Sequence, residues 1–128
     1  NRLAADLDER LADLSALAPD WNTPDGQRPT SIAIQKARRL SQAIYDRLGP
    51  VLGTKALPTS IAPLPSGGIE MEWRANSGMI VGGVSPQGDW GFLHMIGTGR
   101  TARYEEDENG IAEPDLIDLI SRVVSQWY

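Results

Sequence analysis

Residues 67–96 have the sequence GGIEMEWRANSGMIVGGVSPQGDWGFLHMI, and this stretch decides the fold. Apolar and polar residues alternate over residues 69–74, which puts every second side chain on the same face of a half-buried β-strand. Turn-forming residues follow at positions 75–78 and 85–88, and the second turn has the Pro and Gly that a type I turn prefers. The stretch therefore predicts three consecutive antiparallel strands, at residues 69–74, 79–84 and 90–96.

Two further strands extend this meander. Residues 60–64 predict a short edge strand, because Pro63 has no N–H group to donate to a neighbouring strand. A glycine-rich turn at residues 97–99 precedes residues 100–105, which predict one more strand. The sequence therefore predicts an antiparallel sheet of about four to five strands.

Helical periodicity precedes the predicted sheet. In residues 3–18 and 31–48, leucine, isoleucine and alanine recur at spacings of three and four positions, which predicts two helices. The hydroxyl groups of Thr30 and Ser31 are the two candidates to cap the second helix. We expect the Gly-Pro pair at residues 49–50 to end it, because glycine favours a left-handed C-cap and proline cannot continue the hydrogen-bond ladder.

The C-terminal segment carries the clearest apolar stripe of the chain. Pro114 suits the first turn of a helix, and apolar residues then line one face as far as Trp127. The order of elements is two N-terminal helices, an antiparallel meander and one C-terminal helix. This order predicts a single α+β domain over residues 1–128, with the C-terminal helix packed on the sheet.

Length and composition limit the class of protein. The chain has 128 residues, no cysteine, one histidine and a net charge of −5. A chain of this length forms one domain that buries about two thirds of its surface, and the lack of cysteine excludes thiolate catalysis and cysteine-ligated zinc. No apolar run reaches the roughly 18–20 residues of a membrane span, and the first residues lack the pattern of a signal peptide. We therefore expect a soluble, acidic, cytoplasmic protein that does not bind membranes.

Two groups of residues resemble a known group of proteins. The first is Trp21-Asn-Thr-Pro-Asp-Gly26 with the helix after it, and the second is Gly67-Gly-Ile-Glu-Met-Glu-Trp73. Over residues 20–96 the chain is similar to uncharacterised small bacterial and phage α+β proteins, which pair a Trp-Asp/Asn-x-x-x-Gly turn with a Gly-Gly-Ile-x-Leu-Glu-Trp strand. It departs from them at Met71, where leucine is usual, and in its more acidic later segment. The resemblance implies this fold without a catalytic residue, and it points to a prokaryotic antitoxin-like, immunity-like or defence-accessory role.

The candidate catalytic residues fit structural roles better than catalytic ones. His94 is the only histidine, and it alternates with apolar residues on one face of its predicted strand, as a core histidine does. Glu70 and Glu72 lie about 7 Å apart on one face, a separation found in glycosidases, but Arg74 completes the same row as a solvated charge ladder. We keep as an alternative a small ligand-binding or hydrolytic domain whose pocket uses these four residues. It requires His94 and Glu72 to lie on the same side of the sheet.

No pattern predicts a cofactor or a metal ion. Residues 49–55, GPVLGTK, differ from a phosphate-binding loop in the spacing of the glycines and in the order of Thr and Lys. The acidic residues at positions 20–26 do not follow the ligand spacing of a calcium-binding EF-hand loop. We interpret them, and the acidic residues at positions 105–109, as solvated loops.

Charge is distributed in blocks of opposite sign. Residues 28–48 hold five basic residues and one acidic residue, a local charge of +4, whereas residues 105–118 hold seven acidic residues and no basic one. The basic block makes nucleic-acid binding through Lys36, Arg39 and Arg47 a hypothesis, but the sequence pI of about 4.8 argues against it. We interpret these basic residues as the exposed face of a core-packing helix and expect no nucleic-acid partner.

Tryptophans supply the best candidates for partner contacts. Four of the eight aromatic residues are tryptophan, a residue that fills cores and also dominates protein interfaces. We predict a non-enzymatic protein-interaction domain, with core packing as the competing interpretation of these side chains. A homo-oligomer formed through a sheet edge is an alternative assembly. The predicted contact residues are Trp21, Trp73, Trp90, Glu105, Glu106, Asp107 and Glu108.

Overall fold

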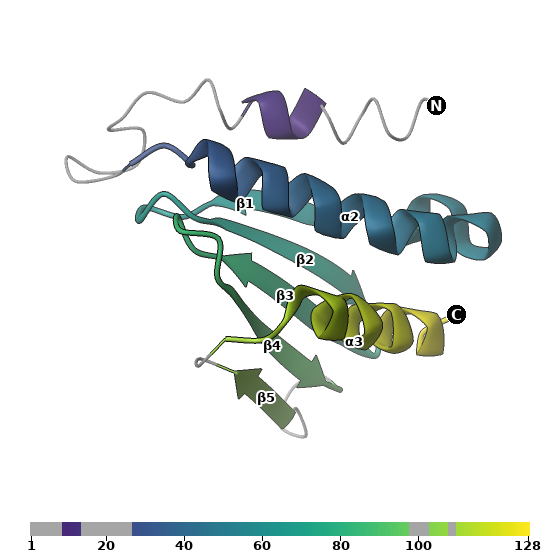
Figure 1. The fold of residues 1–128 in the computed structure, drawn as a ribbon. Coiled ribbons are helices and arrows are strands. Elements are labelled where there is room, and N and C mark those ends of the chain that lie inside the picture. Colours follow the sequence, from purple (N-terminus) through teal and green to yellow (C-terminus); the bar gives the residue numbers. More distant parts are fainter. Residues whose placement is uncertain (1–8, 14–26, 98–102, 108–109) are drawn as a thin grey trace.

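The fold is a five-stranded antiparallel sheet with helices packed on one of its faces (Figure 1). The computed structural model describes residues 9–13, 27–97, 103–107 and 110–128. Each strand pairs with the next one along the chain, so the sheet is a meander in the order β1-β2-β3-β4-β5. The predicted α+β class, antiparallel sheet and C-terminal helix packed on the sheet are confirmed.

The strands lie close to their predicted positions. Their bounds are β1 Ser60–Pro63, β2 Ile69–Ala75, β3 Gly78–Val84, β4 Trp90–Ile96 and β5 Arg103–Asp107. Strand β1 is an edge of the sheet, as the proline at position 63 predicts. Strand β5 continues two residues beyond its predicted end, and its predicted beginning lies outside the described residues.

Strand register divides the side chains between two faces of the sheet. On the face that packs against the helices, here called the inner face, Trp73 is paired with Ile80 and Ile69 with Val84, and all four are buried. The opposite face, here called the outer face, carries the residues that alternate with them. These are Glu70, Glu72 and Arg74 of β2, Met79, Val81 and Gly83 of β3, and Gly91, Leu93 and Met95 of β4.

Helix α2, Ser31–Leu52, begins at the predicted cap. The hydroxyl oxygen of Thr30 accepts from the backbone N–H of Ala33 at 3.1 Å, which satisfies one of the free donors of the first turn. The same hydroxyl group donates to the carbonyl oxygen of Pro86 at 2.8 Å. The cap therefore also ties the beginning of α2 to the turn between β3 and β4.

The prediction that α2 ends at residues 49–50 is wrong. The helix continues through Pro50 to Leu52, and a 3₁₀ helix, η1, follows at Gly53–Ala56. Proline lacks one N–H donor, which costs a single hydrogen bond near the end of the helix, while Leu48 and Leu52 still pack against the core. The helix ends instead at Gly53, which has φ +60° and whose N–H group donates to the carbonyl oxygen of Gly49.

The N-terminal region contributes a short helical segment to the core. Residues 9–13 are helical, Leu11 is fully buried in the core, and Arg10 Nη2 donates to the carbonyl oxygen of Pro58 at 3.3 Å. The predicted helix at residues 3–18 is confirmed for this segment, and its remaining residues lie outside the described part of the chain.

Helix α3, Glu113–Gln126, crosses the inner face beside α2 (Figure 1). Both helices approach the sheet at Gly82 in the middle of β3. A Cβ atom placed there would lie 3.5–3.7 Å from side-chain atoms of Leu40, Ile120 and Leu116. Glycine at this position lets the leucine and isoleucine side chains of both helices fill the space directly above the strand.

A buried polar contact inside the core gives a first prediction. Ser41 Oγ of α2 donates to Met71 Sδ of β2 at 3.0 Å, and both side chains are fully buried. Replacing Met71 by leucine removes the acceptor, so we expect the free energy of unfolding to fall by about 1 kcal/mol in urea denaturation. Adding Ser41→Ala should recover most of that loss. A Met71→Leu protein as stable as the wild type would contradict this account of the contact.

Candidate functional site

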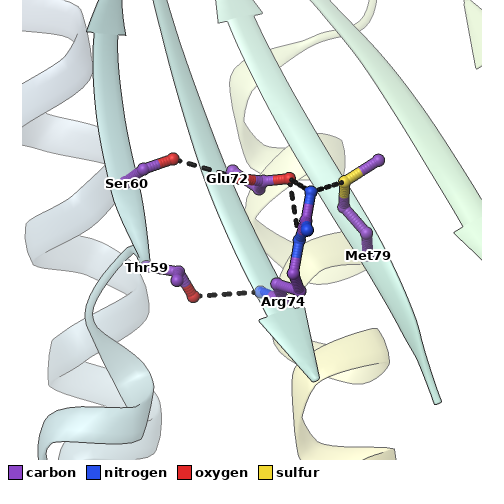
Figure 2. Close-up of polar contacts among 5 residues, drawn as sticks. All are labelled: Thr59, Ser60, Glu72, Arg74 and Met79. Atoms are coloured by element: carbon purple, nitrogen blue, oxygen red, sulfur yellow. Dashed lines mark hydrogen bonds and ion pairs between the residues drawn. The ribbon is translucent and has the colours of Figure 1, made fainter. Parts of the chain in front are cut away.

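The charged row on the outer face is held in a fixed arrangement. Arg74 Nη2 and Nε donate to Glu72 Oε1 at 2.6 and 3.2 Å, and Ser60 Oγ of β1 donates to Glu72 Oε2 at 3.1 Å (Figure 2). Thr59 Oγ1 accepts from the backbone N–H of Arg74 at 3.1 Å. Arg74 Nη2 also lies 3.3 Å from Met79 Sδ. Two strands thus orient this ion pair, whose carboxylate is engaged on both oxygens.

His94 lies on the other face of the sheet. It is paired with Ile80, which is fully buried on the inner face, whereas Glu72 and Arg74 project from the outer face. The sheet backbone therefore separates the imidazole from Glu70, Glu72 and Arg74. The four residues do not line one pocket, and the alternative that uses them together loses its geometric basis.

An apolar band runs along the outer face beside the charged row. Met79 is paired with Met95 and Val81 with Leu93, which places four apolar side chains side by side on β3 and β4. The helices among the described residues pack on the inner face (Figure 1). The sequence pattern contained this band, but it becomes a single surface only once the register of β3 against β4 is known.

A cleft of about 730 Å³ lies at the end of the sheet where β3 turns into β4. Its lining includes Lys36, Asp89, Trp90 and Glu113. Trp90 Nε1 donates to Glu113 Oε1 at 3.4 Å, and Glu113 Oε2 forms an ion pair with Arg39. Glu113 is thus held by two neighbours, and the cleft margin mixes charges of both signs. No sequence pattern indicates this lining, because four separate segments of the chain contribute to it.

The described residues contain no group of three or more histidine, aspartate or glutamate side chains placed to hold a metal ion. Nor does any helix in the described ranges have the length and apolar character needed to cross a membrane.

The predicted contact residues fall in different places. Trp73 is 1% exposed, and its Nε1 donates to the carbonyl oxygen of Ala56 at 3.1 Å, so its ring belongs to the core. Trp90, 4% exposed, is also a core residue at the edge of the cleft. Glu105, Glu106 and Asp107 belong to β5, where they are paired with residues of β4, and a contact role for them stays a prediction. Trp21 and Glu108 lie outside the described residues.

The two charge blocks pair with each other at the surface of the molecule. Arg39 of α2 forms an ion pair with Glu113, and Arg47 forms one with Asp118, both across the contact between α2 and α3. Two of the three residues in the nucleic-acid hypothesis are therefore paired with acidic residues of the same chain. These pairs give an internal explanation for part of the charge pattern.

A double-mutant cycle measures what such a pair contributes. Arg47 and Asp118 have side chains 51% and 64% exposed, so we expect a coupling free energy of only about 0.2–1 kcal/mol that decreases with salt. Arg47→Ala, Asp118→Ala and the double variant are compared by urea unfolding. The cycle of Lys36→Ala with Asp118→Ala is the control and should show no coupling. A coupling well above this range would mean that the pair is shielded from solvent.

Comparison of the chain with protein-family models, with curated proteins and with solved structures finds no match.

Proposed function

We propose that this chain is a non-enzymatic protein-interaction domain that binds its partner on the outer face of the sheet. The observation that carries the proposal is the apolar band of Met79, Val81, Leu93 and Met95 beside the charged row of β2. An apolar centre with a polar margin is the usual composition of a protein interface. Methionine side chains add adaptability, because they are flexible and polarisable.

The face of the sheet is a better contact surface than its first edge. Strand β1 has four residues and includes Pro63. Short edge strands and prolines are features that natural sheets use to prevent pairing with another chain. A homo-oligomer through a sheet edge therefore stays a prediction with weaker support than binding on the outer face.

The resemblance over residues 20–96 supplies the biological setting of the proposal. An antitoxin-like, immunity-like or defence-accessory protein acts by binding another protein, which agrees with an interaction surface and requires no catalytic group. Strand β5 lies beside β4 at the far edge of the sheet. Within the segment Glu105–Asp107, the register pairs only Glu106 with an outer-face residue, so outer-face binding supports a contact role for Glu106. A contact role for Glu105 and Asp107 stays a prediction.

Site-specific photo-crosslinking tests the proposal. A photoreactive amino acid replaces Leu93 on the outer face or, as a control, Gln35, which is exposed on α2. In the cells that produce the protein, we expect one dominant adduct from position 93 and none from position 35. The captured protein is then purified, and its affinity for wild type, Leu93→Glu and Gln35→Glu is measured.

We expect Leu93→Glu to weaken binding at least about tenfold while Gln35→Glu does not, because only the first places a charge in the apolar band. Folded Leu93→Glu protein that binds as tightly as wild type would contradict the proposal. So would equal adducts from both positions.

A further inference from the structure

The inner face shows how this sheet accommodates a helix. Gly82 leaves room above β3, and Leu40, Leu116 and Ile120 of the two helices occupy that room at 3.5–3.7 Å from where a Cβ atom would be. A residue without a side chain thus lies beneath the apolar side chains of the helices. The arrangement brings helical side chains into contact with the sheet backbone.

The outer face has a similar hollow one residue further along. Gly83 of β3 is paired with Gly91 of β4, so neither strand contributes a side chain at this point. A Cβ atom added at Gly83 would have no neighbouring atom within 4 Å. The pair Val81 and Leu93 comes next along the same two strands. The apolar band therefore ends in an open space that an incoming side chain can fill.

The dimensions of the band match those of a helix. Neighbouring strands lie about 4.8 Å apart, so β3 and β4 form a band about 10 Å wide, the diameter of a helix with its side chains. A strand of seven residues spans about 23 Å, which equals the length of about 15 helical residues.

The charges on the strands beside the apolar band determine which kind of partner surface fits it. By sequence, β3 and β4 carry no Asp, Glu, Lys or Arg, whereas both flanking strands are acidic. On the outer face, β2 carries two glutamates and one arginine, a net charge of −1. Of the three acidic residues in β5, only Glu106 is paired with an outer-face residue, Leu93, whereas Glu105 and Asp107 are paired with His94 and Phe92 of the inner face. The chain as a whole has a net charge of −5. A partner therefore meets an apolar band with a net negative row along β2 and one glutamate position, Glu106, along β5.

We propose that the outer face binds an amphipathic α-helix of a partner protein, with its apolar side on the band and lysine or arginine residues along both flanks. This inference rests on the proposed function and names the partner's chemistry. Apolar residues of the helix contact the partly exposed Leu93 beside Val81, which is only 9% exposed, and fill the space over Gly83 and Gly91. Its basic residues lie next to β2, where Glu70 and Glu72 project from the same face, and next to β5.

Two designed helical peptides test the inference. They have the same leucine face, and one has Lys and Arg on its flanks where the other has Glu. Binding of the fluorescein-labelled peptides is measured by anisotropy at low and at physiological salt. We expect the basic peptide to bind at least about tenfold more tightly than the acidic one, with an affinity that falls as salt rises.

Variants locate the binding. Leu93→Glu and Gly83→Leu should each weaken the basic peptide at least about tenfold, because one charges the band and the other fills the hollow. Leu93→Glu makes the protein more acidic, so a loss cannot come from reduced charge attraction. Gln35→Glu adds the same charge on α2 and should leave binding unchanged. Equal binding of both peptides, or binding unaffected by Leu93→Glu and Gly83→Leu, would overturn the inference.

The peptide-binding and crosslinking experiments together show whether the helix inference fails alone or fails together with the proposed function. If neither peptide binds but crosslinking at position 93 captures a partner whose binding Leu93→Glu weakens, the helix inference fails and the interaction function stands. If the crosslinked product is a second copy of this chain, the inference also fails. If the peptides and the crosslinking both give nothing, both proposals are rejected.

Discussion

Replacing Gly68 by alanine is expected to lower the free energy of unfolding by about 3 kcal/mol. A Cβ atom at this position would lie 2.4 Å from the carbonyl oxygen of Val84, far inside van der Waals contact. The backbone has little freedom to move away, because the next residue, Ile69, is paired with Val84. The carbonyl oxygen of Gly68 also accepts from the N–H group of Leu64 at 3.0 Å. The second glycine of the Gly-Gly motif is thus required by the close approach of β3.

Gly83→Ala is the matched control for this prediction. Gly83 lies in the same sheet, yet a Cβ atom there meets nothing within 4 Å. We expect the free energy of unfolding of Gly83→Ala to equal that of the wild type or to exceed it by up to about 1 kcal/mol, because a glycine in a strand loses more backbone entropy on folding than an alanine does. Urea unfolding followed by tryptophan fluorescence measures both variants. Equal stability of Gly68→Ala and Gly83→Ala would contradict the packing of β2 against β3.

Trp73→Ala is expected to lower the free energy of unfolding by about 3–5 kcal/mol. Trp73 is among the largest fully buried side chains, and its indole N–H group donates to the carbonyl oxygen of Ala56 in η1. Its loss leaves a large cavity between the sheet and the helices. Because small domains are stable by only about 5–15 kcal/mol, this variant should approach the limit of folding at room temperature.

Trp73→Phe separates the two contributions of this side chain. Phenylalanine keeps most of the apolar volume but leaves the carbonyl oxygen of Ala56 without its donor, so we expect a loss of about 1–2 kcal/mol. Circular dichroism confirms folding, and urea unfolding gives the stabilities. If Trp73→Ala were as stable as wild type but lost partner binding, Trp73 would be a contact residue and not a core residue.

Alternation along residues 69–74 was sufficient to predict β2 and to place Met71 and Trp73 on one face. It did not decide between core packing and partner contact for Trp73, which the structure places in the core. The same alternation did not decide whether His94 shares a face with Glu72. That depends on the register between neighbouring strands, which pairs Trp73 with Ile80 and Ile80 with His94. A shift of one residue at either turn would move every side chain of the following strand to the opposite face.

The end of α2 shows where a local rule fails. Glycine followed by proline predicts a helix end at residues 49–50, but the helix reaches Leu52. The local cost of a proline is a few kcal/mol, and burial of apolar side chains against the core offsets it when the segment is held there by tertiary packing. Propensity alone does not include that packing.

The candidate site could be predicted only in part. The charged row of β2 follows from alternation, and the structure adds its ion pair and the hydrogen bond from Ser60. The ion pairs between α2 and α3 join residues more than 70 positions apart. No periodicity indicates such pairs, because they depend on how the two helices cross the sheet.

Methionine oxidation tests the central claim most directly, because the three methionines of the chain sample both faces of the sheet. Met71 is fully buried on the inner face, whereas Met79 and Met95 are paired on the outer face and partly exposed. Dilute hydrogen peroxide followed by peptide mass spectrometry should show Met79 and Met95 oxidised at least about tenfold faster than Met71. Addition of the partner protein captured by crosslinking at position 93 should then slow the oxidation of Met79 and Met95. Rapid oxidation of Met71, or unchanged oxidation of Met79 and Met95 in the complex, would contradict an open outer face that the partner covers.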